Sequence, residues 1–122
     1  MLMTKIFKFE SAHNLLNYEG ACSNLHGHSY ELHVSLKGNT LVNGMLVDFS
    51  KLKEIVQRKV ISKLDHAYLN DIVTQPTAEH IAQWIFSQLS WANNDAITLH
   101  SIKLYETATS FIEYKGEEIE DR

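Results

Sequence analysis

Three histidines of this 122-residue chain are spaced so that their side chains can meet at one point. His26 and His28 open a segment in which every second residue from 30 to 36 is apolar, which is the period of a β-strand with one buried face. Counting back by twos places both histidines on that face, whereas His33 has the opposite parity and is expected to point away. Two imidazoles at positions i and i+2 of one strand face can bind the same small ion.

A strand pattern also leads to His13, the expected third ligand. Aromatic and charged side chains alternate over residues 7–10. Counting on by twos from the aromatic residues reaches His13, which is therefore expected on the same strand face. Antiparallel pairing of the two strands would bring His13 against His26 and His28. Three histidines without an evident fourth protein ligand are typical of a catalytic zinc site with an open position. We therefore predict a Zn²⁺ ion at His13, His26 and His28, although a single buried histidine is usually only a hydrogen-bonded core residue.

Cys22, the only cysteine, lies in a polar loop four residues before His26. Free cysteines are usually small hydrophobic residues of a core. In this loop the Cys22 sulfur has two alternative uses. It is a base or nucleophile if nearby positive charge favours the thiolate, or it is a fourth metal ligand that makes the site structural. The residues alone leave both uses open.

Two further groups are of types suited to proton transfer or ligand binding. In Asp65-His66, the carboxylate can orient an imidazole that exchanges a proton with Cys22 or a substrate. The alternative is an ordinary helix end, where a histidinium is mildly favoured by the helix dipole. Glu106 is the last residue of the alternating series that faces the core on a predicted strand. A carboxylate buried there needs a hydrogen-bonding partner, such as the two adjacent N–H groups of a guanidine-like heterocycle. The alternative for Glu106 is a strand end in solvent.

Length and composition limit the class of protein. A chain of 122 residues is long enough for one domain with a single core. A formal net charge of −4 argues against nucleic acid or an anionic membrane as the main partner. No apolar run approaches the roughly 20 residues that a membrane span needs. The lone cysteine excludes an intramolecular disulfide, and we predict a cytoplasmic protein.

The elements that must position these residues follow from periodicity and turn signals. The second strand is predicted from about residue 26 to 37, and Asp48 then caps a predicted helix. The apolar positions of this helix are Phe49, Leu52, Val56, Val60 and Leu64. Thr77 is predicted to cap a second helix with an apolar stripe at Ala78, Ile81, Ala82, Ile85 and Leu89. Residues 93–95 are predicted as a loop before strands over 97–106 and 111–115.

This order predicts an α+β domain with a four-stranded antiparallel sheet and two helices on one face, ββααββ. The single domain covers residues 1–122, of which the acidic residues 116–122 are predicted to be a flexible tail. The exposed edges of such a sheet are a liability unless they are covered or paired. Pairing between subunits that closes a barrel would remove both edges.

Several short motifs, taken in chain order, resemble the 6-pyruvoyltetrahydropterin synthase superfamily. They are Phe9-x-Ser11-Ala12-His13, Cys22-x-x-x-His26-Gly27-His28, Gly44-Met45-x-Val47-Asp48-Phe49, Leu64-Asp65-His66-x-x-Leu69-Asn70, Pro76-Thr77-x-Glu79 and Tyr105-Glu106-Thr107. Within the superfamily, the spacing of three residues between the cysteine and His-Gly-His resembles the bacterial 6-carboxy-5,6,7,8-tetrahydropterin synthases of queuosine biosynthesis. The chain departs from the pattern at His80, where the family commonly has asparagine.

The resemblance implies a role for each matching residue. The three histidines would hold zinc, Cys22 would be the proton-abstracting base, and His66 with Asp65 would complete the proton relay. Glu106 would anchor the pterin ring and join the relay as a catalytic residue. The implied enzyme is a carbon–oxygen and carbon–carbon lyase that converts 7,8-dihydroneopterin triphosphate to 6-carboxy-5,6,7,8-tetrahydropterin, acetaldehyde and triphosphate. The implied architecture is the tunnelling fold, with subunits in a homo-oligomeric barrel, a trimer-based hexamer or a tetramer.

Two alternative functions use the same residues. The first is a 6-pyruvoyltetrahydropterin synthase, a triphosphate lyase with the same site and a different product. The second is a zinc- and pterin-binding subunit without catalysis of its own. The presence of Cys22 disfavours the second alternative, because binding alone has no use for a thiol base.

Overall fold

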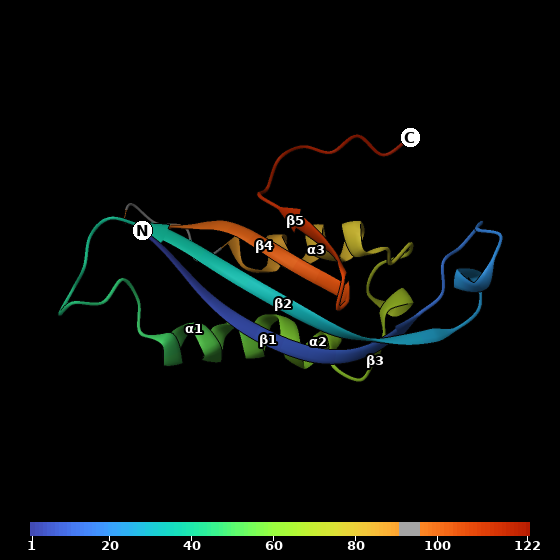
Figure 1. Ribbon diagram of the computed structural model, residues 1–122, viewed down its shortest axis with the longest axis horizontal. Coiled ribbons are helices and arrows are strands. Elements are labelled where there is room, and N and C mark those ends of the chain that lie inside the picture. Colours follow the sequence, from blue (N-terminus) through green and yellow to red (C-terminus); the bar gives the residue numbers. More distant parts are fainter. Residues whose placement is uncertain (91–95) are drawn as a thin grey trace.

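The centre of the molecule is a twisted sheet with the strand order β3-β1-β2-β4-β5 (Figure 1). The structure, a computed structural model, describes residues 1–90 and 96–122, so the loop predicted at residues 93–95 lies outside the described residues. The strands are β1 (Leu2–His13), β2 (His26–Gly38), β3 (Ala67–Tyr68), β4 (Ile97–Thr107) and β5 (Ser110–Tyr114). The pairs β1–β2, β2–β4 and β4–β5 are antiparallel, and β3 pairs in parallel with β1.

The helices lie on one side of this sheet (Figure 1). Helix α1 (Phe49–Val56) continues through a π-helical segment, Gln57–Ile61, into α2 (Ser62–Leu64), and α3 (Ala78–Gln88) follows. Both predicted caps are confirmed, because the Asp48 side chain accepts a hydrogen bond from the Ser50 N–H and the Thr77 side chain accepts one from the His80 N–H. No helix of the described ranges combines the length and the apolar character that a membrane span needs.

Alternation along the strands decides which face of the sheet is buried. On β2, Tyr30, Leu32 and Val34 are at most 1% exposed, while the residues between them are only half-buried. The buried strand residues form one core with buried helix residues such as Leu52 and Ile85. The α+β architecture predicted from the sequence is therefore confirmed, and the burial of apolar side chains between sheet and helices holds it together.

Two details of the fold differ from the prediction. The sheet has a fifth strand, the two-residue β3, which is too short to carry a periodic signal. Beside it, the Ser11 hydroxyl lies 2.6 and 3.0 Å from the carbonyl oxygens of Leu64 and Ala67. Phe49, predicted on the buried stripe of the first helix, is 55% exposed. It is the first residue of α1, and the buried positions of that helix begin one turn later at Leu52.

The acidic residues 116–122 form no helix or strand, yet polar contacts tie them to the domain. The Tyr114 hydroxyl donates to the Glu117 carbonyl at 2.7 Å, and the Asp121 carboxylate lies 2.5 Å from Nε2 of His80. The predicted flexibility of this tail stays a prediction. His80 lies in the first turn of α3, and the sequence assigned it no role; in the structure its imidazole has the Asp121 carboxylate as a partner.

The buried face of β2 predicts a large stability effect at Leu32, which is fully buried. Leu32→Ala is expected to lower the free energy of unfolding by about 2–5 kcal/mol, because contacts are lost and a cavity remains. Leu25→Ala removes the same atoms from a side chain that is 67% exposed, and its expected cost is under about 1 kcal/mol. Urea unfolding of both variants checks this, and equal costs would contradict the assignment of the core face.

Candidate metal and substrate site

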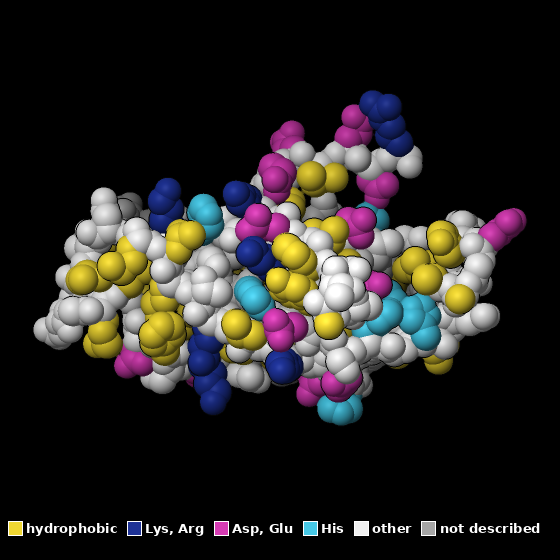
Figure 2. Space-filling model, in the orientation of Figure 1, with side chains coloured by type: hydrophobic (Ala, Val, Ile, Leu, Met, Phe, Trp, Pro, Cys, Tyr) yellow, Lys and Arg dark blue, Asp and Glu magenta, His cyan; other side chains and the backbone are white. Residues whose placement is uncertain are grey.

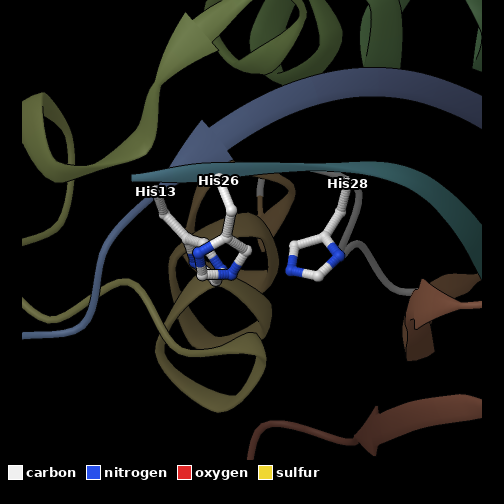
Figure 3. A group of neighbouring side chains, drawn as sticks. All are labelled: His13, His26 and His28. Atoms are coloured by element: carbon white, nitrogen blue, oxygen red, sulfur yellow. The ribbon is translucent and has the colours of Figure 1, made fainter. Parts of the chain in front are cut away.

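Antiparallel pairing of β1 and β2 brings the three predicted histidines together at one end of the sheet. His13 pairs directly with His26, and Ser11 pairs with His28, so all three imidazoles project from the same face. In Figure 3 the three side chains point to the same side of the strands, and one ligand nitrogen from each lies within 4.8 Å of the other two. Figure 2 shows histidine side chains gathered where the ends of β1 and β2 meet the loop over residues 14–25. The predicted convergence of these side chains is confirmed.

The hydrogen bonds of His13 and His26 leave their Nε2 atoms available to a cation. Nδ1 of His13 lies 2.7 Å from the Pro76 carbonyl oxygen, and Nδ1 of His26 lies 2.7 Å from the Asn24 carbonyl oxygen. A carbonyl oxygen only accepts, so each Nδ1 carries the proton and each neutral ring presents a lone pair at Nε2. The two Nε2 atoms are 3.0 Å apart. Their lone pairs therefore face each other unless a proton or a metal ion lies between them.

His28 supplies a third nitrogen of the same kind. Its Nε2 atom is buried and has no hydrogen-bond partner in the described part of the chain. Burial lowers the pKa of His28; the Glu106 carboxylate opposes this effect, and His13 and His26 reinforce it. The neutral ring is thus favoured, and the 3.7 Å contact between His28 Nε2 and Glu106 Oε1 is too long for a hydrogen bond. Three imidazoles with converging ring nitrogens fit a divalent transition-metal ion.

Cys22 lies in the loop that links His13 to His26. It belongs to a short 3₁₀ turn, Ala21–Ser23, and is half-buried, and its carbonyl accepts a hydrogen bond from the Leu15 N–H at 2.9 Å. The clustered ligand atoms in the described residues come from the three histidines, and the Cys22 sulfur is not among them. The role of Cys22 as a base stays a prediction.

Asp65 and His66 are fastened to the edge of β1 at Glu10. The Glu10 N–H donates to Asp65 Oδ1 at 2.9 Å, and the His66 N–H donates to the Glu10 carbonyl at 2.6 Å. The Glu10 amide is the main cause that lowers the pKa of Asp65, and the adjacent His66 imidazole, 3.1 Å away, adds to it. His66 has a φ of 57°, a left-handed conformation that is uncommon outside glycine. A hollow of about 400 Å³ is lined by both His66 and His28.

Glu106 lies near the end of β4, where the pairing with β5 shifts in register between Tyr105 and Thr107. Its side chain is 30% exposed, between the buried and the solvated alternatives considered for it. It lines a hollow of about 340 Å³ together with the first turn of α3 and the start of β5. Residue spacing alone assigned no role to that helix turn, and the only signal for it was the Pro76-Thr77-x-Glu79 motif.

Comparisons with known proteins agree with this geometry. The family model described as 6-pyruvoyl tetrahydropterin synthase matches residues 2–117. A 6-carboxy-5,6,7,8-tetrahydropterin synthase of Synechocystis sp. is 42% identical over 120 residues, which cover 93% of this chain and 92% of that protein. A 6-pyruvoyl tetrahydrobiopterin synthase of Dictyostelium discoideum is 35% identical over 133 residues, which cover 96% of this chain and 97% of that protein.

The fold itself has a close match among solved structures. The structure of Caenorhabditis elegans 6-pyruvoyl tetrahydropterin synthase superposes with a TM-score of 0.84 at 28% sequence identity, and the match covers 96% of each chain. The family model spans most of this chain, and the curated relatives are matched almost from end to end. The resemblance predicted from the motifs is confirmed. The chain therefore belongs to the 6-pyruvoyl tetrahydropterin synthase family of enzymes.

Proposed function

We propose that the protein is a lyase that converts 7,8-dihydroneopterin triphosphate to 6-carboxy-5,6,7,8-tetrahydropterin, acetaldehyde and triphosphate in queuosine biosynthesis, with Zn²⁺ as its cofactor. The observation that carries this proposal is the convergence of three imidazole nitrogens within 4.8 Å of one another. The 42% identity to a 6-carboxy-5,6,7,8-tetrahydropterin synthase supports this choice of product.

His13, His26 and His28 would hold the metal ion. A bound divalent ion acts as a Lewis acid that makes substrate hydroxyls more acidic and stabilises negative charge on their oxygens. The carbonyls of Pro76 and Asn24 fix the tautomer and orientation of two of the rings, which raises the basicity of the nitrogens that face the ion.

Cys22 and His66 would move protons between carbon atoms of the substrate side chain. The Cys22 thiolate would be the base, carried by a loop whose two ends are the ligand histidines His13 and His26. The Asp65 carboxylate, held by the Glu10 amide, lies 3.1 Å from Nδ1 of His66 and would orient this imidazole for proton transfer. His66 lines the same hollow as His28, which supports a proton relay beside the metal ligands.

Glu106 would anchor the substrate ring. An ionised carboxylate accepts hydrogen bonds at both oxygens and so matches the adjacent amide and amino N–H groups at the edge of a pterin. The hollow between Glu106 and the first turn of α3 is the space in which a flat heterocycle would lie.

The free edges of the sheet support a homo-oligomer. In the described residues, the outer side of β1 pairs with β3 only at Ser11 and Ala12, and the short β5 forms the opposite edge. Pairing of these edges between subunits would close a barrel, as a trimer-based hexamer or a tetramer. A cytoplasmic location completes the proposal, since Cys22 is a free thiol.

A second candidate is the 6-pyruvoyl synthase reaction, which the 35% identity to the Dictyostelium relative favours. Incubation of zinc-loaded protein with 7,8-dihydroneopterin triphosphate separates the two candidates. Mass spectrometry is expected to identify 6-carboxy-5,6,7,8-tetrahydropterin with acetaldehyde and triphosphate. A pyruvoyl product without acetaldehyde would select the second candidate, and pterin binding without turnover would indicate a non-catalytic subunit.

The metal ligands predict a sharp contrast between two histidine substitutions on the sheet. His13→Ala is expected to weaken zinc binding by roughly a hundredfold or more. Removal of a residue that only hydrogen-bonds to a metal ligand already lowers metal affinity by about 10- to 100-fold, and removal of the ligand itself should lower it at least as much. His33→Ala is the matched control, because His33 lies on the other face of β2 and bonds to Glu31. Zinc content after dialysis against a weak chelator measures the difference. A His13→Ala variant that retains one zinc per chain would contradict the assignment.

Substitution of Cys22 separates a base from a metal ligand. Cys22→Ala is expected to lower kcat by roughly 10²- to 10⁴-fold, the usual contribution of a general base, while zinc stays at one ion per chain. Steady-state kinetics and elemental analysis of the same preparation check both parts. Loss of zinc together with activity would instead make Cys22 a structural ligand, and full turnover would exclude it as the base.

A further inference from the structure

The Tyr30 hydroxyl is a second buried polar atom without a hydrogen-bond partner among the described residues, besides His28 Nε2. Tyr30 is 1% exposed, and its ring stacks on Phe9 with the centroids 4.9 Å apart and the planes inclined by 7°. The packing therefore holds the hydroxyl in one place. Buried hydroxyls almost always have a partner, so an exception calls for a specific explanation.

Tyr30 lies beside the candidate site. Its ring makes edge-to-face contacts with His28 and His13, at centroid distances of 5.7 and 6.5 Å. The β2–β4 register pairs Leu32 with Leu104 and Glu31 with Tyr105, and its continuation sets Tyr30 opposite Glu106 on the same face. A carboxylate oxygen only accepts hydrogen bonds, so toward Glu106 the phenol hydroxyl of Tyr30 can act only as a donor.

Glu106 is a complementary group. In the described ranges its carboxylate makes an ion-pair contact with His28 Nε2 at 3.7 Å, which is too long for a hydrogen bond. The register shift of β4 at this point frees Glu106 from the regular ladder. A donor and an anionic acceptor thus project from neighbouring positions of the adjacent strands β2 and β4.

We propose that Tyr30 is a positioning residue of the substrate site, whose hydroxyl donates a hydrogen bond to the Glu106 carboxylate when a pterin ring occupies the hollow beside it. The inference rests on the proposed function, in which Glu106 anchors the ring. A flat heterocycle that covers Glu106 excludes water from it, which strengthens the attraction between phenol and carboxylate. The charge-assisted bond then holds both carboxylate oxygens toward the ring edge.

The test compares two variants that each lose one tyrosine hydroxyl. Tyr30→Phe removes the unpartnered hydroxyl, and Tyr114→Phe removes one that already donates to the Glu117 carbonyl at 2.7 Å, away from the histidines. Thermal unfolding and zinc content are measured without ligand. Binding is measured with neopterin, a stable fluorescent pterin, and kcat and KM are measured with 7,8-dihydroneopterin triphosphate.

Tyr30→Phe is expected to unfold at the wild-type temperature or above it and to keep its zinc, because the ligand-free protein loses no hydrogen bond. Its neopterin affinity is expected to fall roughly tenfold, with a matching rise in KM and a much smaller change in kcat. Tyr114→Phe is expected to show the reverse, a lower unfolding temperature with unchanged neopterin binding.

Two results would overturn the role of Tyr30 alone. One is wild-type neopterin affinity in Tyr30→Phe, and the other is a loss of stability as large as that of Tyr114→Phe, which would show that the hydroxyl is already paired without ligand. A wild-type protein that neither binds neopterin nor turns over the triphosphate would overturn the proposed function, and this inference with it. The two failures are therefore distinguishable in one set of measurements.

Discussion

The direct pairing of His13 with His26 in the β1–β2 ladder is the constraint on which the site depends. In a ladder with a side-chain period of two, a slip by one residue would turn every side chain of one strand to the opposite face. Such a slip would expose Phe7 and Phe9, which are at most 5% exposed, at the same time as it separated the histidines. The hydrophobic core therefore fixes the three histidines without any contribution from a bound ion.

The other groups of the site are fastened to the same strands by backbone hydrogen bonds. Glu10 binds Asp65 and His66 through its N–H and carbonyl, and the Pro76 carbonyl just before α3 reaches His13. Helix ends far apart in the sequence are thereby held at the end of the sheet that carries the three histidines. The helices thus have two roles, since their apolar faces cover the core and their termini present polar groups to the histidines.

The sequence predicted the strands, whose apolar residues alternate with a regular period, and the helices, whose first residue follows a recognisable capping residue. Strand periodicity located β1, β2 and the histidine cluster, and Asp48 and Thr77 marked both helix starts. The two-residue β3 and the register shift near Glu106 were not predictable, because neither has a period. Alternation likewise predicted that Tyr30 is buried, but whether its hydroxyl finds a partner depends on side chains from another strand.

A metal ion accounts for the histidine cluster better than a shared proton does. One proton between the Nε2 atoms of His13 and His26 would relieve the contact of their lone pairs at 3.0 Å. It would leave the buried Nε2 of His28 without a partner, at a cost in free energy that a native site avoids. A divalent ion would satisfy all three nitrogens. Because His13 and His26 also bound the loop that carries Cys22, the same ion would close that loop and so link metal binding to the order of the proposed base.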